Sequence, residues 1–284
     1  MNADDGDRAV SSAERARINR AYWDSLAAVH GNGDDRYYDV AALLAGESTL
    51  TDIEERAVRS AVGDVAGLDV LHVQCHIGFD TITLARRGAR VTGVDLSPAS
   101  LAKAAELAER CGVDAAFVAG DSTDLPAELY DRFDLAYATI GVINWIDDMG
   151  AWMRSAARCL RPGGHLVLAD LHPMVVMLDS ADPPRFGWPY QDTRAFVEDQ
   201  QGSYANADAA LAAPTSVSYA HGIGDLITAA LGAGLRLTGF EEHTSMGFDP
   251  LGILFSREED GRYRVRADGQ PLPVMFTLLA ARPG

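Results

Sequence analysis

The sequence predicts an α/β fold built around a doubly wound, mostly parallel sheet. Short apolar runs rich in β-branched residues alternate with amphipathic helical segments through the middle of the chain. The runs are apolar on both faces, which is typical of strands buried in a parallel sheet. The chain has 284 residues, of which 48% are hydrophobic and 23% charged, so it is long and apolar enough to bury a full core.

The core elements follow one another in a regular order. Strands are predicted at residues 69–74, 90–94, 115–119, 133–138 and 165–171, with helices at 79–87, 98–111 and 148–160 between them. Gly112 is a suitable stop for the second helix, and the Arg-Pro-Gly-Gly run at 161–164 ends the third. The scaffold continues with a helix near 224–233 and strands at 235–242 and 274–281.

Two segments lie outside this alternation. Residues 1–62 are interpreted as an N-terminal tail and helical cap, with helices over 12–30 (capped by Ser11 or Ser12) and near 52–62. Residues 63–284 then form the main domain. Within it, the stretch from about 173 to 222 is too long and aromatic for a plain connection, so we interpret it as a lid insertion.

Charge and composition argue against several functions. The chain carries 24 basic and 41 acidic residues, a formal net charge of −17, so nucleic acid and anionic membrane surfaces are poor partners. Its three cysteines form no CxxC pair and its histidines have no HxxxH spacing, so neither disulfides nor a bound metal are expected. The first residues lack the features of a signal peptide, and no run approaches the roughly 20 apolar residues of a membrane span. We expect a cytoplasmic protein with a small-molecule substrate; a homodimer is among the oligomeric states left open.

The segment at residues 70–97 carries the most chemistry. It predicts a strand, a tight loop containing Gly78, a helix, and a second strand that ends in Asp95. In a doubly wound sheet, ligands bind beyond the carboxyl ends of the strands at the topological switch point. An acidic residue at the end of the second strand can accept hydrogen bonds from a ribose diol. The segment therefore predicts a nucleotide-type ligand at this edge.

This segment, together with residues 119–122, 133–141 and 160–166, resembles the class I S-adenosylmethionine (SAM)-dependent methyltransferases. The first motif of that family is a hydrophobic strand, an acidic residue and a GxGxG loop. This chain departs from it at three positions: His72 stands at the acidic position, and Gln74 and His76 replace the first two glycines, while Gly78 remains. The wording VLHVQCHIGFDT is close to a bacterial subfamily with an LQCHxGxDT-type loop. The resemblance therefore implies a variant loop that still binds SAM.

The same resemblance implies a Rossmann-like, seven-stranded sheet of order 3-2-1-4-5-7-6, with the last strand antiparallel. It implies that Asp95 holds the ribose and Asp121 the adenine amino group. Aromatic residues of the leader, including Trp23 and Tyr37, can attract a sulfonium by cation–π contact or can simply pack. The cofactor-binding set implied is Tyr22, Tyr38, Gln74, His76, Gly78, Asp80, Asp95, Leu96, Asp121, Ser122 and Thr139.

Three residues are catalytic candidates. His172 follows the fifth strand, where we expect the mouth of the site, and can act as general base for an acceptor hydroxyl or amine, or can only orient the strand end. Tyr204 and His221 belong to the insertion and are candidates for substrate contact. His72, inside a strand, is expected to be a buried histidine with its hydrogen bonds satisfied.

The predicted function is SAM-dependent methyl transfer to the oxygen, nitrogen or carboxyl group of a small molecule, of the kind found in secondary metabolism. The Asp-Pro-Pro-Tyr motif of many nucleobase amino-methyltransferases is absent, and Asn144 and Trp145 stand there as candidates to line the acceptor pocket. One alternative is a SAM lyase that closes an azetidine ring and releases methylthioadenosine. A non-catalytic SAM-binding protein is another. A dinucleotide-dependent oxidoreductase is disfavoured, because GxGxxG is missing.

Overall fold

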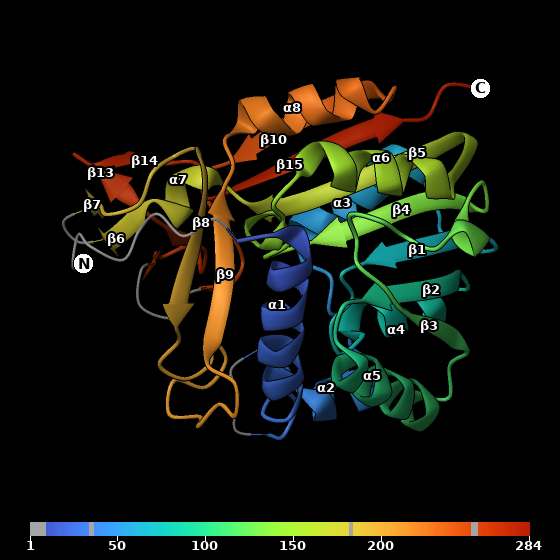
Figure 1. Cartoon of the computed structure of the whole chain (residues 1–284), viewed down its shortest axis with the longest axis horizontal. Helices are drawn as coiled ribbons and strands as arrows, with labels where there is room; N and C mark the ends of the chain where they lie inside the picture. Colours follow the sequence, from blue (N-terminus) through green and yellow to red (C-terminus); the bar gives the residue numbers. More distant parts are fainter. Residues whose placement is uncertain (1–9, 34–36, 182–183, 251–254) are drawn as a thin grey trace.

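A seven-stranded sheet forms the centre of the computed structural model, which describes residues 10–33, 37–181, 184–250 and 255–284 (Figure 1). The strands run in the order β10-β15-β5-β4-β1-β2-β3, so the predicted order is confirmed. β15 is antiparallel to both of its neighbours, while the other pairs are parallel. The strands are β1 (Asp69–Val73), β2 (Arg90–Asp95), β3 (Ala115–Ala119), β4 (Phe133–Thr139), β5 (Leu160–Leu171), β10 (Arg236–His243) and β15 (Met275–Ala281).

Strand β5 is longer than the sequence indicated. The strand was predicted to begin at residue 165, after the Arg-Pro-Gly-Gly run, but it begins at Leu160 and includes that run. Its pairing with β4 shifts register between Phe133 and Leu135, and Gly163 adopts a φ of +81° inside the shift. Only glycine adopts such a φ without strain, so Gly163 allows a local bend within β5. The Arg-Pro-Gly-Gly run therefore bends the strand but does not interrupt it.

Helices cover both faces of the sheet. α3 and α4 pack with β1, β2 and β4 in one apolar cluster, and α6 and α8 pack with β4, β5 and β15 in another, whose centre is the fully buried Trp152. Gly112 ends α5 with a φ of +66°, as expected. The helices of the main domain are α4 (Phe79–Arg86), α5 (Pro98–Cys111), α6 (Met149–Cys159) and α8 (Ile223–Gly232), with short 3-10 turns η1 (Ala127–Leu129) and η2 (Ile143–Trp145).

The N-terminal segment forms helices α1 (Ser12–Ala27), α2 (Val40–Ala45) and α3 (Asp52–Val62), of which α2 was not predicted. Ser11 caps α1 by accepting a hydrogen bond from the backbone N–H of Glu14. α1 lies between α5 and the insertion (Figure 1). The buried side chain of Asn19 both donates to the carbonyl of Val217 and accepts from its N–H, as a neighbouring strand would.

The insertion at residues 173–222 contains a short helix and two hairpins. These elements are α7 (Pro173–Val176), β6 (Leu178–Ala181), β7 (Pro184–Phe186), β8 (Asp192–Asp199) and β9 (Thr215–Ala220). β8 and β9 pair with each other and stand beside α1 (Figure 1). Four two-residue strands between β10 and β15 were not predicted; they are β11 (Ser256–Arg257), β12 (Tyr263–Arg264), β13 (Arg266–Ala267) and β14 (Gln270–Pro271).

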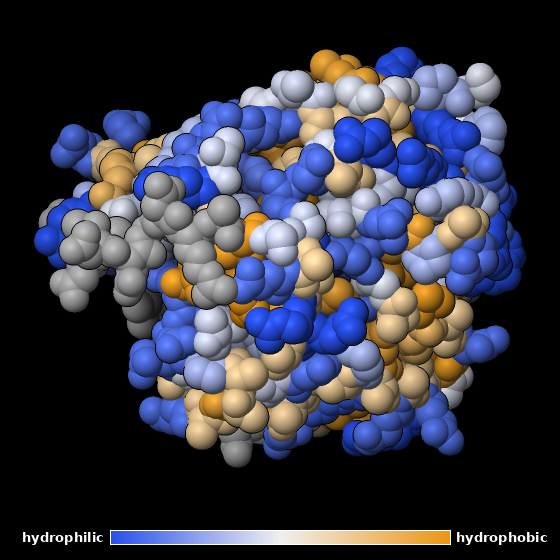
Figure 2. All heavy atoms as spheres, in the orientation of Figure 1, coloured by the Kyte–Doolittle hydropathy of each residue, from blue (hydrophilic) through white to orange (hydrophobic). Residues whose placement is uncertain are grey.

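The surface drawn in Figure 2 is mostly polar, with small apolar groups between the polar residues. Large exposed apolar side chains include Phe186 and Val197 of the insertion and Leu231 of α8. Among the described residues, no helix combines the length and the hydropathy that a membrane crossing requires.

Candidate functional site

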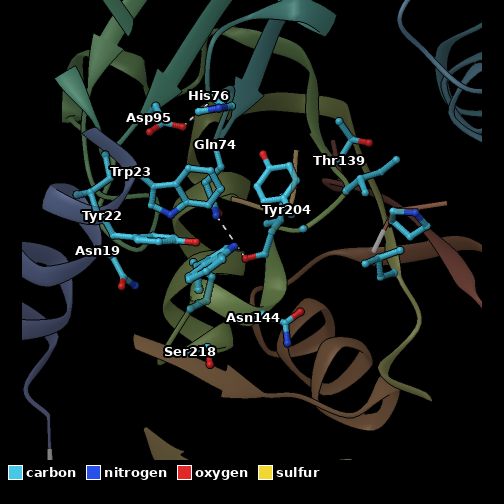
Figure 3. Close-up of a pocket in the computed structure, with 18 of the residues that line it drawn as sticks. Asn19, Tyr22, Trp23, Gln74, His76, Asp95, Thr139, Asn144, Tyr204 and Ser218 are labelled. Carbon is cyan, nitrogen blue, oxygen red and sulfur yellow. Dashed lines mark hydrogen bonds between the residues drawn. The ribbon is translucent and has the colours of Figure 1, made fainter. Parts of the chain in front are cut away.

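A cavity of about 1010 Å³ lies at the carboxyl ends of β1, β2 and β4 and is bordered by α1 and the insertion (Figure 3). Its volume is at the upper end of the range of about 300–1,000 Å³ for single-ligand sites, so it has room for two ligands side by side. Every residue predicted to bind the cofactor lines it: Tyr22, Tyr38, Gln74, His76, Gly78, Asp80, Asp95, Leu96, Asp121, Ser122 and Thr139.

The loop after β1 keeps a glycine-type backbone without its first two glycines. Gln74 has a φ of +60° and His76 a φ of +47°, and both stand at positions where the GxGxG loop has glycine. Side-chain hydrogen bonds hold the two residues in this strained region. The Gln74 Oε1 accepts from the indole N–H of Trp152 at 2.8 Å, and the His76 ring lies 3.0 Å from the hydroxyl of Ser100. The loop variant therefore preserves the backbone path.

Gly78 is required for packing as well as for its backbone. Its φ is +77°, and a Cβ built on it would lie 2.8 Å from the Cβ of Ala104 on α5. Any side chain would push the first turn of α4 away from α5. The remaining glycine thus lets α4 begin directly under the cavity.

Asp95 ends β2 and turns its carboxylate toward this loop (Figure 3). It accepts hydrogen bonds from the backbone N–H of His76 at 2.8 Å and of Ser97 at 2.9 Å. Burial raises the pKa of Asp95 to about 6, against these hydrogen bonds. A buried carboxylate with lone pairs remaining beside a cavity fits the hydroxyl groups of a ribose.

Asp121 follows β3 and is joined to the N-terminal helix. The buried guanidinium of Arg15 lies 2.6 Å from Asp121 Oδ2 and 3.2 Å from Asp147 Oδ1. Arg15 was not recognised in the sequence, because an arginine in a leader helix gives no sign of contacting residues 121 and 147. This ion pair ties α1 to the end of the cavity where Asp121 and Ser122 lie.

A pair of carboxylates, the buried Glu54 and the partly buried Asp80, lies at the end of the cavity near Thr139. Glu54 accepts hydrogen bonds from the N–H of Thr51 and from the hydroxyls of Tyr137 and Thr139, while the hydroxyl of Thr49 donates to Asp80 at 2.5 Å. Burial and the neighbouring charge of Glu54 raise the pKa of Asp80 to about 7. Asp80 was predicted; Glu54 was missed, since Thr51-x-x-Glu54 is a capping box and gives a sufficient structural reason for the glutamate.

Asp170 shapes the loop after β4, and it too was missed. Its fully buried carboxylate accepts hydrogen bonds from the N–H of Val142 at 2.8 Å and of Ile143 at 2.9 Å, and also from Gly141. These contacts turn successive N–H groups away from the cavity and fix the wall beside Thr139.

Aromatic rings form the wall between these ends (Figure 3). The ring of Trp145 lies 5.7 Å from Tyr22 and 5.2 Å from Trp23 between centroids. The hydroxyl groups of Tyr38 and Tyr204 form a hydrogen bond with each other, and both residues line the cavity. This aromatic wall is therefore assembled from α1, the segment after it, η2 and the insertion.

The other two catalytic candidates lie elsewhere. His172 caps α7, accepting from the N–H of Met174, and its Nε2 lies 2.9 Å from Glu242. The Nε2 of His221 lies 2.6 Å from the carbonyl oxygen of Ile146. Neither belongs to the cavity lining among the described residues, so the expected place of His172 at its mouth is not met. His72 is buried and lies 2.8 Å from the hydroxyl of Thr81, as a satisfied core histidine should.

Residues 70–164 match the family model described as "Methyltransferase domain". A ubiquinone biosynthesis O-methyltransferase of Xanthomonas oryzae pv. oryzae (strain PXO99A) is 38% identical over 114 residues, which are 40% of this chain and 47% of that protein. The match thus spans about half the length of this curated relative.

Two solved structures share the fold. The SAM-dependent methyltransferase from Mesorhizobium loti superposes with a TM-score of 0.53 at 21% identity, covering 84% of this chain and all of the other. The [4+2]-cyclase SpnF superposes with a TM-score of 0.56 at 15% identity, covering 98% of each chain. The chain therefore has the Rossmann-like methyltransferase fold.

Proposed function

We propose that this chain is a SAM-dependent methyltransferase whose acceptor is a small molecule without a free anionic group. The observation that carries the proposal is the buried carboxylate of Asp95, fixed by two backbone N–H groups over the loop at 74–78. That loop belongs to the segment that matches the methyltransferase family model.

The residues present fit SAM along the whole cavity. Asp95 suits the ribose hydroxyls, and Asp121 with Ser122 suits the adenine at the far end. Glu54 and Asp80 repel each other in a buried place, so an ammonium group such as that of the methionine moiety would relieve their repulsion. When bound, SAM supplies a methyl group that is already activated for nucleophilic attack.

The protein's own contribution is therefore orientation and exclusion of water. The aromatic wall of Tyr22, Trp23 and Trp145 and the hydroxyl pair of Tyr38 and Tyr204 enclose the middle of the cavity. Their faces can attract a cationic sulfur centre. Tyr204 lies where it can contact an acceptor and guide its nucleophilic atom.

Charge defines the class of acceptor. The charged residues among the described lining are Arg15, Glu54, Asp80, Asp95, Asp121 and Glu198, and the single cation, Arg15, is already paired with Asp121 and Asp147. An acceptor with a carboxylate or phosphate would add a second anion to the methionine carboxylate of SAM, and it would lose its hydration without gaining a protein cation. A neutral or basic molecule with an aromatic or apolar body fits the wall.

Product analysis tests this function. The protein is incubated with SAM alone and with matched sets of neutral, amine-bearing and carboxylate-bearing acceptors, and the nucleoside products are identified by mass spectrometry. S-adenosylhomocysteine formed together with a methylated neutral or basic acceptor is the expected result. Methylthioadenosine formed without an acceptor would instead support the lyase, and preference for the carboxylate set would contradict the acceptor class.

A further inference from the structure

Tyr219 of strand β9 has a buried hydroxyl group with no hydrogen-bond partner among the described residues. The residue is only 5% exposed, and it lines the cavity. Leaving a buried polar group unpaired costs free energy, so such groups are rare in folded proteins. A cavity-lining hydroxyl that lacks a protein partner points to a partner from the ligand.

The strand that carries Tyr219 is held in place on both sides. Its carbonyl oxygen accepts from the side-chain amide of Asn144, in the turn after β4, at 3.1 Å. Two residues earlier, Val217 exchanges both backbone hydrogen bonds with Asn19 of α1. The backbone that carries the buried ring is therefore fixed on both sides.

The neighbours of β9 show which end of the cavity the hydroxyl occupies, because β9 is bound to Asn19 of α1 and Arg15 lies one turn earlier on that helix. Arg15 and Asp147 both lie near enough to influence the pKa of Tyr219, which burial raises to about 12. Arg15 pairs with Asp121 through one guanidinium nitrogen and with Asp147 through its Nε. The unpaired hydroxyl of Tyr219 is thus assigned to the end of the cavity where Asp121 follows β3.

We propose that the Tyr219 hydroxyl forms a hydrogen bond with the purine ring of the cofactor, so that the insertion itself helps to recognise adenine. This inference rests on the proposed function, because it requires an adenosyl ligand at the Asp95 and Asp121 end. A purine edge offers ring nitrogens as acceptors and an exocyclic amine as donor, and a tyrosine hydroxyl can satisfy either. The contact would link cofactor binding to the position of β8 and β9.

The variant Tyr219→Phe tests this contact by calorimetric titration with S-adenosylhomocysteine. We expect affinity to fall about tenfold, which corresponds to about 1.4 kcal/mol. The 1-deaza, 3-deaza, 7-deaza and N6,N6-dimethyl analogues are titrated in parallel. The analogue that lacks the partner atom should bind wild type about tenfold more weakly than S-adenosylhomocysteine and should be insensitive to Tyr219→Phe.

Stability of the ligand-free protein gives a second readout. Removing an unpaired buried hydroxyl should leave the melting temperature unchanged or raise it, while the increase produced by S-adenosylhomocysteine becomes smaller. A merely structural hydroxyl would behave in the opposite way. Tyr190→Phe is the matched control: Tyr190 lies in the same insertion and accepts from the N–H of Ile223, but does not line the cavity. Its affinity should stay at the wild-type value.

Wild-type affinity in Tyr219→Phe would overturn the inference, as would an equal loss for S-adenosylhomocysteine and every purine analogue. Both results presuppose that wild type binds S-adenosylhomocysteine. A wild-type protein that binds none of the adenosyl ligands would overturn the proposed function and this contact with it.

Discussion

The Nε2 of His76 lies 2.7 Å from the Nδ1 of His30, so the loop after β1 and the segment after α1 share a histidine pair. The second nitrogen of His30 lies 2.5 Å from the hydroxyl of Ser203 in the insertion, and that of His76 lies 3.0 Å from Ser100 on α5. One chain of hydrogen bonds thus connects four separate segments around the cavity. Through His30, Ser203 of the insertion is thus linked to the loop after β1.

This pair should make the protein sensitive to acid. Burial and the nearby charge of Lys103 lower the pKa of His30 to about 3, and burial also lowers that of His76. Below about pH 6.5 these two histidines bind protons in the unfolded chain but stay neutral in the folded one. The free energy of unfolding should therefore fall by up to about 1.4 kcal/mol per pH unit for each histidine. Urea unfolding between pH 4.5 and 7.5 measures the slope.

The variant His30→Gln should reduce that slope, because it removes one of the two histidines whose pKa is lowered by burial. A slope that His30→Gln does not alter would show that the pair does not control acid stability.

Gln74 allows a test of backbone strain against side-chain anchoring. The positive φ of Gln74 strains the backbone by about 1 kcal/mol, and Gln74→Gly removes this strain. The same substitution leaves the buried indole N–H of Trp152 unpaired. An unpaired buried donor costs about 1–3 kcal/mol, which is more than the strain that is removed. The free energy of unfolding of Gln74→Gly should therefore be lower than that of wild type by about 1 kcal/mol. Gln74→Ala, which keeps the strain and loses the anchor, should be less stable still. Denaturant unfolding that finds the glycine variant more stable than wild type would contradict this account.

Asp80 should make cofactor affinity depend on pH near neutrality. An ammonium group favours the ionised carboxylate, and because the pKa of Asp80 is raised to about 7, affinity should increase as pH rises through that value and level off above it. Asp95, with a pKa of about 6, should add a second decrease at lower pH. Calorimetric titration with S-adenosylhomocysteine from pH 5.5 to 8.5 measures both.

Asp80→Asn should lower affinity at pH 8 and remove the change near pH 7. Asp52→Asn, at an acidic residue of α3 outside the cavity lining, should retain the wild-type profile. Retention of the change near pH 7 in Asp80→Asn would mean that another group titrates there.

The sequence was most informative where chemistry follows local pattern. Strand β3 and helix α5 have the predicted bounds, because apolar periodicity and a glycine stop are local signals. The short strands β11 to β14 lack such a signal, since two-residue pairings depend on contacts across the fold. They were missed for that reason.

The residues of the candidate site also fall into those that local pattern predicts and those that depend on distant contacts. Residues in the loop and at strand ends, such as Asp95, were predicted because topology brings them to one edge and because the family resemblance implies their roles. Arg15, Asp170 and Tyr219 were missed, because their roles depend on partners that are distant in the sequence. His172 was expected at the cavity because it follows a strand, but its ring instead caps α7 and faces Glu242. A place at a strand end thus predicts the neighbourhood of a side chain and not its direction.

Calorimetric titration of SAM into wild type and Asp95→Asn tests the central claim most directly. The account predicts a single saturable site in wild type and affinity about tenfold to a hundredfold weaker in the variant, since hydrogen bonds to a charged group contribute about 1.5–3 kcal/mol. Asp52→Asn should bind like wild type. Absence of SAM binding to wild type, or equal affinity in Asp95→Asn, would contradict the assignment of this cavity.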